Sequence, residues 1–157
     1  MSFPEKVYTN KELREAKALI AQGYKHELIV DGKSDFTKKV KEALEHLRTA
    51  GYYDYLQSYI RKIVEIDGMT QLRETEVAIW ANKFAVDNPV DAASLFVQKA
   101  FTMEEYMQGK LYYGGTAEKR STARRVEFLE ALRDKSANRE VREECERLLE
   151  LWKDSSL

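Results

Sequence analysis

The sequence predicts an all-α fold, a single-domain antiparallel bundle of six to seven helices with a short extended connector near residues 27–31. Apolar residues recur about every 3.6 positions in at least six segments, the spacing of one helix face. All seven glycines and both prolines stand at or near the edges of these segments. The connections between the segments are short, which favours antiparallel neighbours.

Length and charge limit the class of protein. The 157 residues fit one domain, residues 1–157, with a flexible N-terminal segment at 1–8 and a frayed C-terminus at 154–157. Charged residues make up 34% of the chain, which is typical of helices with solvated outer faces. The formal net charge of -1 excludes a whole-molecule field that attracts nucleic acid or an anionic membrane.

The first helix is expected to begin at Thr9, because Glu12 stands three positions later in the spacing of a capping box, and to end at Gly23. The next segment, residues 27–32, is short and β-branched and closes with a turn pair. It therefore predicts either an extended connector or a lone edge strand.

Two further helices are expected to form a hairpin. Ser34 or Asp35 caps the first, which ends at Gly51, and the second runs from Tyr52 to Gly68. Both carry one apolar stripe.

The central pair of helices is predicted from Thr70 to Val86 and from Pro89 to about Phe101, where few positions are polar. A helix without a polar face belongs in the interior. Asn88 as N-cap and Pro89 at the first helical position explain the break between the two. The residues expected to be mostly buried are Trp80, Phe84, Phe96, Val97, Ala100 and Leu129.

A flexible joint at residues 112–116 precedes the sixth helix, whose apolar positions run from Ala123 to Leu132. Asn138 opens the last helix, with apolar positions from Val141 to Trp152. No fixed-period repeat is present, which disfavours a solenoid.

Side chains that usually carry chemistry are scarce. His26 stands in the connector and His46 on a charged helix face, and both are expected at the surface or its rim. Neither has enough His, Cys or Glu nearby for a metal site. Cys145 has the spacing of a small buried apolar residue. We therefore expect no catalytic residue, no metal and no cofactor. With one cysteine and no signal peptide or membrane span, the sequence predicts a cytoplasmic protein that does not bind membranes.

Tyrosines form the first of two features that indicate a function. Tyr52, Tyr55 and Tyr59 are spaced along one helix face, and tyrosine is enriched at interfaces because its ring buries apolar area while its hydroxyl stays paired. A core helix whose rings end at the surface is the alternative. Leu28 and Val30 in the extended connector form a second candidate contact.

The segment 110–125 is the second such feature, with five basic residues against one acidic residue. A Gly-Gly-Thr joint opens a helix there, an arrangement that can hold a phosphate while flanking tyrosines stack on a base. The alternative is that the arginines pair with nearby glutamates. The candidate anion- or nucleic-acid-binding residues are Tyr112, Tyr113, Thr116, Lys119, Arg120, Arg124 and Arg125.

Three classes of function follow. The favoured one is a non-catalytic, cytoplasmic protein-interaction or assembly module that forms a homo-oligomer or binds a protein partner. The second is an RNA or phosphorylated-ligand binder that uses segment 110–125. The third is a helical enzyme with an unidentified carboxylate site.

Overall fold

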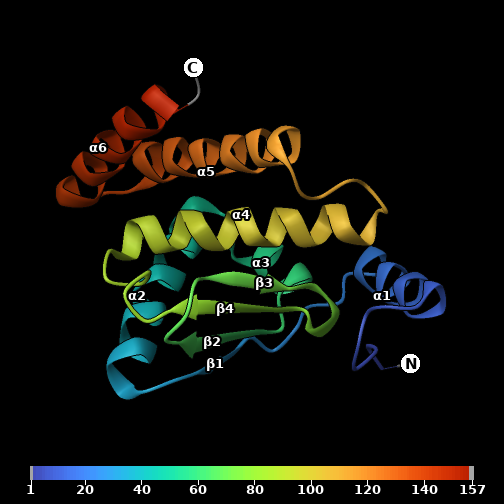
Figure 1. The fold of residues 1–157 in the computed structure, drawn as a ribbon. Coiled ribbons are helices and arrows are strands. Elements are labelled where there is room, and N and C mark those ends of the chain that lie inside the picture. Colours follow the sequence, from blue (N-terminus) through green and yellow to red (C-terminus); the bar gives the residue numbers. More distant parts are fainter. Residues whose placement is uncertain (1, 156–157) are drawn as a thin grey trace.

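The fold is mixed α/β, with six α-helices and one four-stranded sheet in the part of the chain that is described (Figure 1). The computed structural model describes residues 2–155, and the side chains of residues 2–153. The predicted all-α antiparallel helical bundle is therefore wrong. Most of the difference lies in residues 60–82, where strands replace the end of the expected third helix and most of the fourth.

Helices and strands are interspersed along the chain before three long helices close it. A short 3-10 turn, η1 (Glu74–Glu76), links the third strand to the fourth. The elements in order are α1 (Asn10–Ala21), β1 (Ile29–Asp31), α2 (Ser34–Ala50), α3 (Tyr53–Tyr59), β2 (Lys62–Ile66), β3 (Gln71–Arg73), β4 (Ala78–Asn82), α4 (Pro89–Met107), α5 (Gly115–Lys135) and α6 (Arg139–Ser155).

Local capping signals fix several helix ends as the sequence predicts. Thr9 and Glu12 form both bonds of the capping box that opens α1. The Asn88 side chain accepts from two backbone N–H groups at the start of α4, and Asn138 accepts from one at the start of α6. Gly51 ends α2 with φ at 83°, a left-handed conformation that glycine adopts without strain. The predicted cap of α2 by Ser34 or Asp35 is wrong, because α2 begins at Ser34 and its N-cap residue, Lys33, forms no side-chain cap bond.

The strands β2 and β4 explain the wrong fold class. The expected helix from Tyr52 stops at Tyr59, and the following residues are rich in β-branched side chains, which favour strands. Residues 78–82 form a short apolar run, and such a run is typical of a buried parallel strand as well as of a buried helix. Periodicity alone does not distinguish the two.

The strand order in the sheet is β1-β2-β4-β3, with β1, β2 and β4 parallel and β3 antiparallel to β4. Residues 29–31 therefore form an edge strand rather than an unpaired connector. Val30, Ile63, Ile79 and Leu72 stand in one row across the four strands, and all four pack in the core. This row identifies the inner face of the sheet, which α2 and α4 cover.

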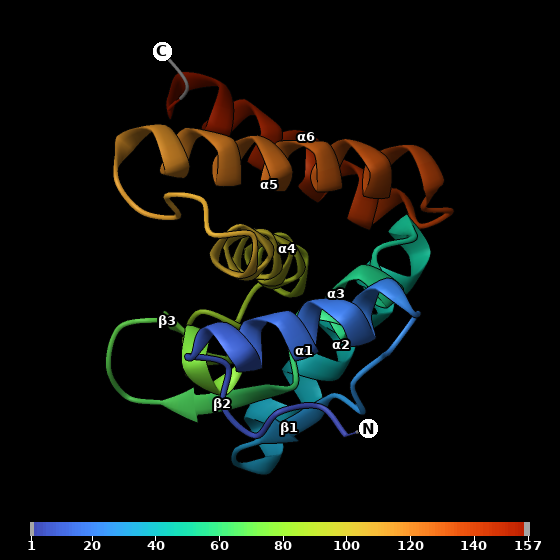
Figure 2. The ribbon, with the colours of Figure 1, turned by 90° about the vertical axis from the view of Figure 1, so that its right-hand side faces the viewer.

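Helix α4 lies between two layers (Figure 2). The sheet, α2 and α3 are on one side of it, and α5 and α6 are on the other. The prediction of a central, buried α4 is confirmed for Phe96, Val97 and Ala100, and Leu129 of α5 is buried beside them. The prediction is wrong for Phe84, which is 67% exposed in the turn after β4, and Trp80 is only partly buried because it lies on the outer face of the sheet.

The N-terminal segment, expected to be flexible, lies against the fold. Val7 is fully buried and its carbonyl accepts from the Tyr106 hydroxyl at 2.7 Å. The carbonyl of Pro4 accepts from the Arg61 guanidinium at 2.9 Å. Of the C-terminal residues expected to fray, 156 and 157 lie outside the described part, and α6 continues to Ser155.

His26 is buried, which corrects the expectation that it lies at the surface. Its ring packs edge-on against Phe3 and Tyr24, with centroids 4.4 and 5.0 Å away. Burial, together with the charge of Arg61, lowers the pKa of His26 to about 4. The folded protein therefore holds this imidazole neutral.

We predict that the free energy of unfolding decreases as the pH falls from about 6.5 to about 4. In this window the unfolded chain protonates His26 and the folded chain does not, so stability is full above the window and falls by up to about 3 kcal/mol across it. Urea denaturation at several pH values measures the slope. His26→Phe removes the titrating group, so its free energy of unfolding is expected to decrease less over this pH range. The same pH dependence of the free energy of unfolding in both proteins contradicts the prediction.

Candidate functional site

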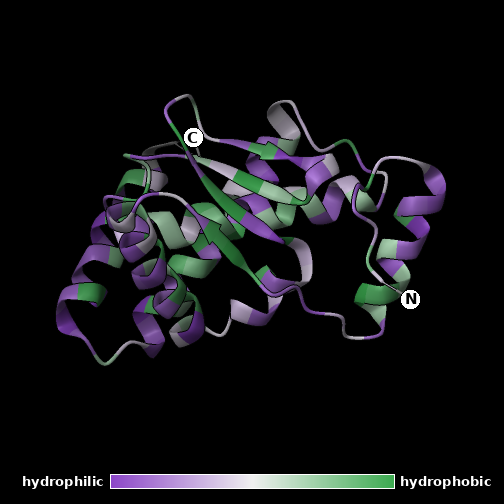
Figure 3. Ribbon diagram, turned by 90° about the horizontal axis from the view of Figure 1, so that it is seen from below, coloured by the Kyte–Doolittle hydropathy of each residue, from purple (hydrophilic) through white to green (hydrophobic). Residues whose placement is uncertain are grey.

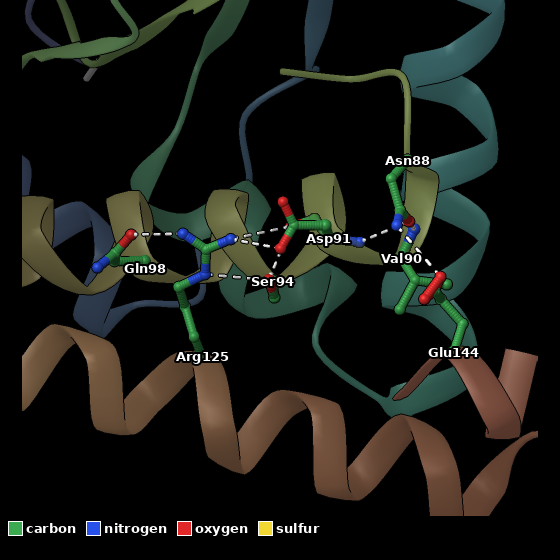
Figure 4. Close-up of polar contacts among 7 residues, drawn as sticks. All are labelled: Asn88, Val90, Asp91, Ser94, Gln98, Arg125 and Glu144. Carbon is green, nitrogen blue, oxygen red and sulfur yellow. Dashed lines mark hydrogen bonds and ion pairs between the residues drawn. The ribbon is translucent and has the colours of Figure 1, made fainter. Parts of the chain in front are cut away.

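The buried arginine of the basic segment is part of the structural framework. Arg125 of α5 is 8% exposed and reaches α4 (Figure 4). Its guanidinium donates to Ser94 Oγ at 3.1 Å, to Gln98 Oε1 at 3.2 Å and to Asp91 Oδ1 at 2.8 Å. It also stacks on the Trp152 ring of α6 at 4.6 Å. Arg125 therefore joins α4, α5 and α6 instead of facing an anion.

The other two arginines of this segment also have carboxylate partners. Arg120 pairs at 2.8 Å with Glu105, whose side chain is only 3% exposed, and donates to the Leu111 carbonyl. Arg124 pairs with Glu127 at 2.7 Å, the neighbour on α5 that the sequence offered as an alternative. The anion-binding hypothesis therefore requires these arginines to exchange an existing carboxylate for the ligand.

The remaining candidates of the basic segment lie at its outer end. Tyr112 packs edge-on against Tyr106 and Tyr113, and Tyr113 is 64% exposed. Thr116 and Lys119 are exposed in the first turns of α5, which begins after Gly114 without a side-chain cap. Arg125 is buried against α4, so it does not share the exposed surface on which Thr116 and Lys119 lie.

Of the three candidate tyrosines, Tyr55 and Tyr59 lie on α3 against α4, and Tyr52 is the N-cap residue of α3. Tyr55 donates to Glu104 Oε1 at 2.7 Å, and Tyr59 lies 3.4 Å from Glu104 Oε2. Their ring centroids are 5.3 Å apart. Tyr52 packs edge-on against buried Phe128 of α5. All three rings are partly buried against the core, and two hydroxyls converge on one carboxylate.

Glu104 lies where two surface cavities meet. The larger, about 350 Å³, lies between α3, α4 and α5. The smaller, about 230 Å³, lies between α1, α3 and α4, and Glu104 lines both. We call the two cavities together the Glu104 groove. The residues that line it are Gly51, Tyr52, Tyr55, Val97, Phe101, Glu104, Arg124 and Glu127 in the larger cavity and Lys17, Ile20, Ala21, Tyr59, Glu104, Met107 and Gln108 in the smaller.

In the groove, the Glu104 carboxylate has two neutral hydrogen-bond donors, the hydroxyls of Tyr55 and Tyr59. Burial, reinforced by Glu104, raises the pKa of Tyr59 to about 12 and raises that of Tyr55 further. Both hydroxyls therefore stay protonated at neutral pH and orient the carboxylate. Glu104 forms no ion pair with any residue from 2 to 153, and the nearby Arg124 is engaged with Glu127 and the Phe101 ring.

The second candidate contact is not part of the groove. Leu28 and Val30 pack against the core at the edge of the sheet and line neither cavity. The structure therefore brings Tyr52, Tyr55 and Tyr59 together with Arg124, and leaves the connector residues elsewhere.

Glu104 is the residue that sequence reasoning missed. It lies 45 residues beyond Tyr59 in the chain, so only the packing of α3 on α4 brings its carboxylate to the tyrosines. The sequence of α4 alone does not distinguish Glu104 from other partly exposed glutamates. The spacing of Tyr55 and Tyr59 was the available signal, since two partly buried hydroxyls on one helix face each need a polar partner and lie close enough to share one.

Comparison with known proteins assigns no family: no family model, curated protein or solved structure matches this chain. In the described residues, no group of three or more His, Cys, Asp or Glu side chains forms a metal site. None of the helices there is long and apolar enough to cross a membrane. The functional argument therefore rests on the geometry of the groove.

We predict that Arg125→Ala lowers the free energy of unfolding by about 3 kcal/mol, because it leaves Asp91, Ser94 and Gln98 without their donor between packed helices. Arg124→Ala, at an exposed position on the same helix, is the matched control and costs less than about 1 kcal/mol. Urea denaturation measures both. Equal losses in the two variants contradict a framework role for Arg125.

Proposed function

We propose that this chain is a non-catalytic protein-interaction module and that its Glu104 groove binds a lysine or arginine side chain of a partner protein. One observation carries the proposal. The Glu104 carboxylate is held by two tyrosine hydroxyls between two cavities, and no cation of the described residues pairs with it. A carboxylate in this position is a ready partner for a positive charge from another molecule.

The groove offers a basic side chain two kinds of interaction, a hydrogen bond to a carboxylate and contact with aromatic rings. A charge-assisted hydrogen bond to Glu104 is about twice as strong as a neutral one. The rings of Tyr55 and Tyr59 lie next to the carboxylate and supply apolar surface for the methylene chain and a π-face for the cation. Because the tyrosines already orient the carboxylate, little ordering is left to occur on binding.

A peptide segment fits the groove better than a small cation does. The larger cavity is lined by Val97 and Phe101, and the smaller by Ile20 and Met107, so apolar surface lies on either side of Glu104. A segment with a central basic residue and flanking apolar residues fills both cavities. Such an anchor in a pocket with an apolar surround is the common organisation of protein interfaces.

Binding rather than catalysis is supported by the protonation of the groove. A general acid or base works best with a pKa near the operating pH, and the pKa values of Tyr55 and Tyr59 are displaced upward, away from it. The thiol of Cys145 is buried, and burial raises its pKa to about 11. We include the expected cytoplasmic location in this proposal, because a lone free cysteine suits a reducing compartment.

The proposal predicts selective binding of a basic tripeptide. Acetyl-Leu-Lys-Leu-amide is expected to bind roughly 10-fold more tightly than the same peptide with norleucine in place of lysine, because only lysine pairs with Glu104. Glu104→Gln is expected to abolish that difference. Titrations followed by ¹H–¹⁵N NMR shifts measure the affinities.

Glu130→Gln is the matched control, since Glu130 is exposed on α5 and lines neither cavity. It keeps the preference for lysine. Equal binding of the two peptides, or no binding of either to the unmodified protein, removes the proposal.

A further inference from the structure

The sheet has one face that none of the helices within residues 2–155 covers. Figure 3 shows this face from below, with apolar segments along its strands. We call it the open face. Both apolar and polar side chains alternate with the buried row on this face, namely Ile29, Asp31, Lys62, Val64, Ile66, Gln71, Arg73, Ala78, Trp80 and Asn82. In the two adjoining turns Met69 is 86% exposed and Phe84 is 67% exposed.

From this face we infer that the chain forms a homodimer in which the open face of one copy packs against that of the other. The first argument is the topology of the sheet. Strands β1, β2 and β4 are parallel, and parallel sheets occur almost only where both faces are covered. Here α2 and α4 cover one face, and the antiparallel strand β3 lies at the edge of the sheet. We therefore expect a second layer over the parallel strands to come from another molecule.

The second argument is charge, and it identifies the partner as a second copy. The charged groups around the open face are already paired within the chain: Lys62 with Asp31 at 3.6 Å, Lys83 with Asp67 at 3.1 Å, and Arg73 with Glu76 at 3.8 Å. This leaves no excess charge of either sign to select a basic or acidic partner. The open face of a second copy is also internally neutral, so the two faces can pack together without leaving an unpaired charge.

The composition of the face suits a packed interface. The Arg73 guanidinium of the edge strand β3 lies 4.1 Å from the ring centroid of Trp80 in β4, so a large aromatic group and an arginine lie together on the face. Trp and Arg are enriched among residues that dominate binding energy. Two such faces related by a two-fold axis pack about 10 Å apart, as in a β-sandwich.

The homodimer leaves the groove accessible. None of the residues that line the Glu104 groove belongs to a strand, since they come from α1, α3, α4 and α5 and from the cap residues Gly51, Tyr52 and Gln108. A dimer through the open face therefore presents two grooves, and a bivalent partner gains affinity from both. The dimer does not depend on the proposed function of the groove.

Sedimentation equilibrium of the full chain tests this inference. The unmodified protein is expected at twice the 18.3 kDa chain mass at micromolar concentration. Met69→Ser combined with Phe84→Ser is expected to raise the dimer dissociation constant by roughly 100-fold, because two contacts are lost from each copy. Both side chains are exposed in the single chain, so its fold does not need them.

Tyr113→Ser is the matched control, because Tyr113 is 64% exposed, close to Phe84 at 67%, but lies in the loop between α4 and α5 and not in a turn of the sheet. It is expected to keep the dimer, as is Glu104→Gln in the groove. Val64→Lys, which places a charge beside Trp80 at the middle of β2, is a second disrupting variant. A monomeric unmodified protein overturns the inference, and so does a dimer that both disrupting variants leave intact.

Discussion

The structure depends on the burial of one helix from two sides. Helix α4 closes the inner face of the sheet and at the same time receives α5 and α6. Its buried residues include Phe96 and Val97, and truncating such a residue removes contacts on both sides. Because α4 also carries polar residues into this interior, its packing requires a donor, and Arg125 supplies it to Asp91, Ser94 and Gln98.

The position of the Glu104 groove follows from that constraint. Towards its C-terminal end, α4 alternates buried and half-buried residues: Met103 and Glu105 are buried, and Glu104 between them is half-buried. Helix α3 packs against this end of α4 and brings two tyrosine hydroxyls to Glu104. The contacts that stabilise the fold therefore also assemble the carboxylate, the rings and the two cavities.

The sequence predicts the features that depend on near neighbours in the chain. The capping box at Thr9 and the Asn88–Pro89 start of α4 are set within four residues, and the buried face of α4 is read from one segment. The sheet was missed because a short apolar run is compatible with a buried strand and with a buried helix. Strand pairing also joins residues that are far apart in the sequence. The environment of His26 and the role of Glu104 were missed for the same reason, because their contacts are with residues elsewhere in the sequence.

The central claim is that Glu104, with Tyr55 and Tyr59, receives a basic side chain. Intermolecular nuclear Overhauser effects test it most directly, with ¹³C-labelled protein and the unlabelled lysine tripeptide. The account predicts contacts from the lysine ε-methylene protons to the ring protons of Tyr55 and Tyr59. Contacts to Tyr112 and Tyr113 instead, with none to the two groove tyrosines, would contradict it.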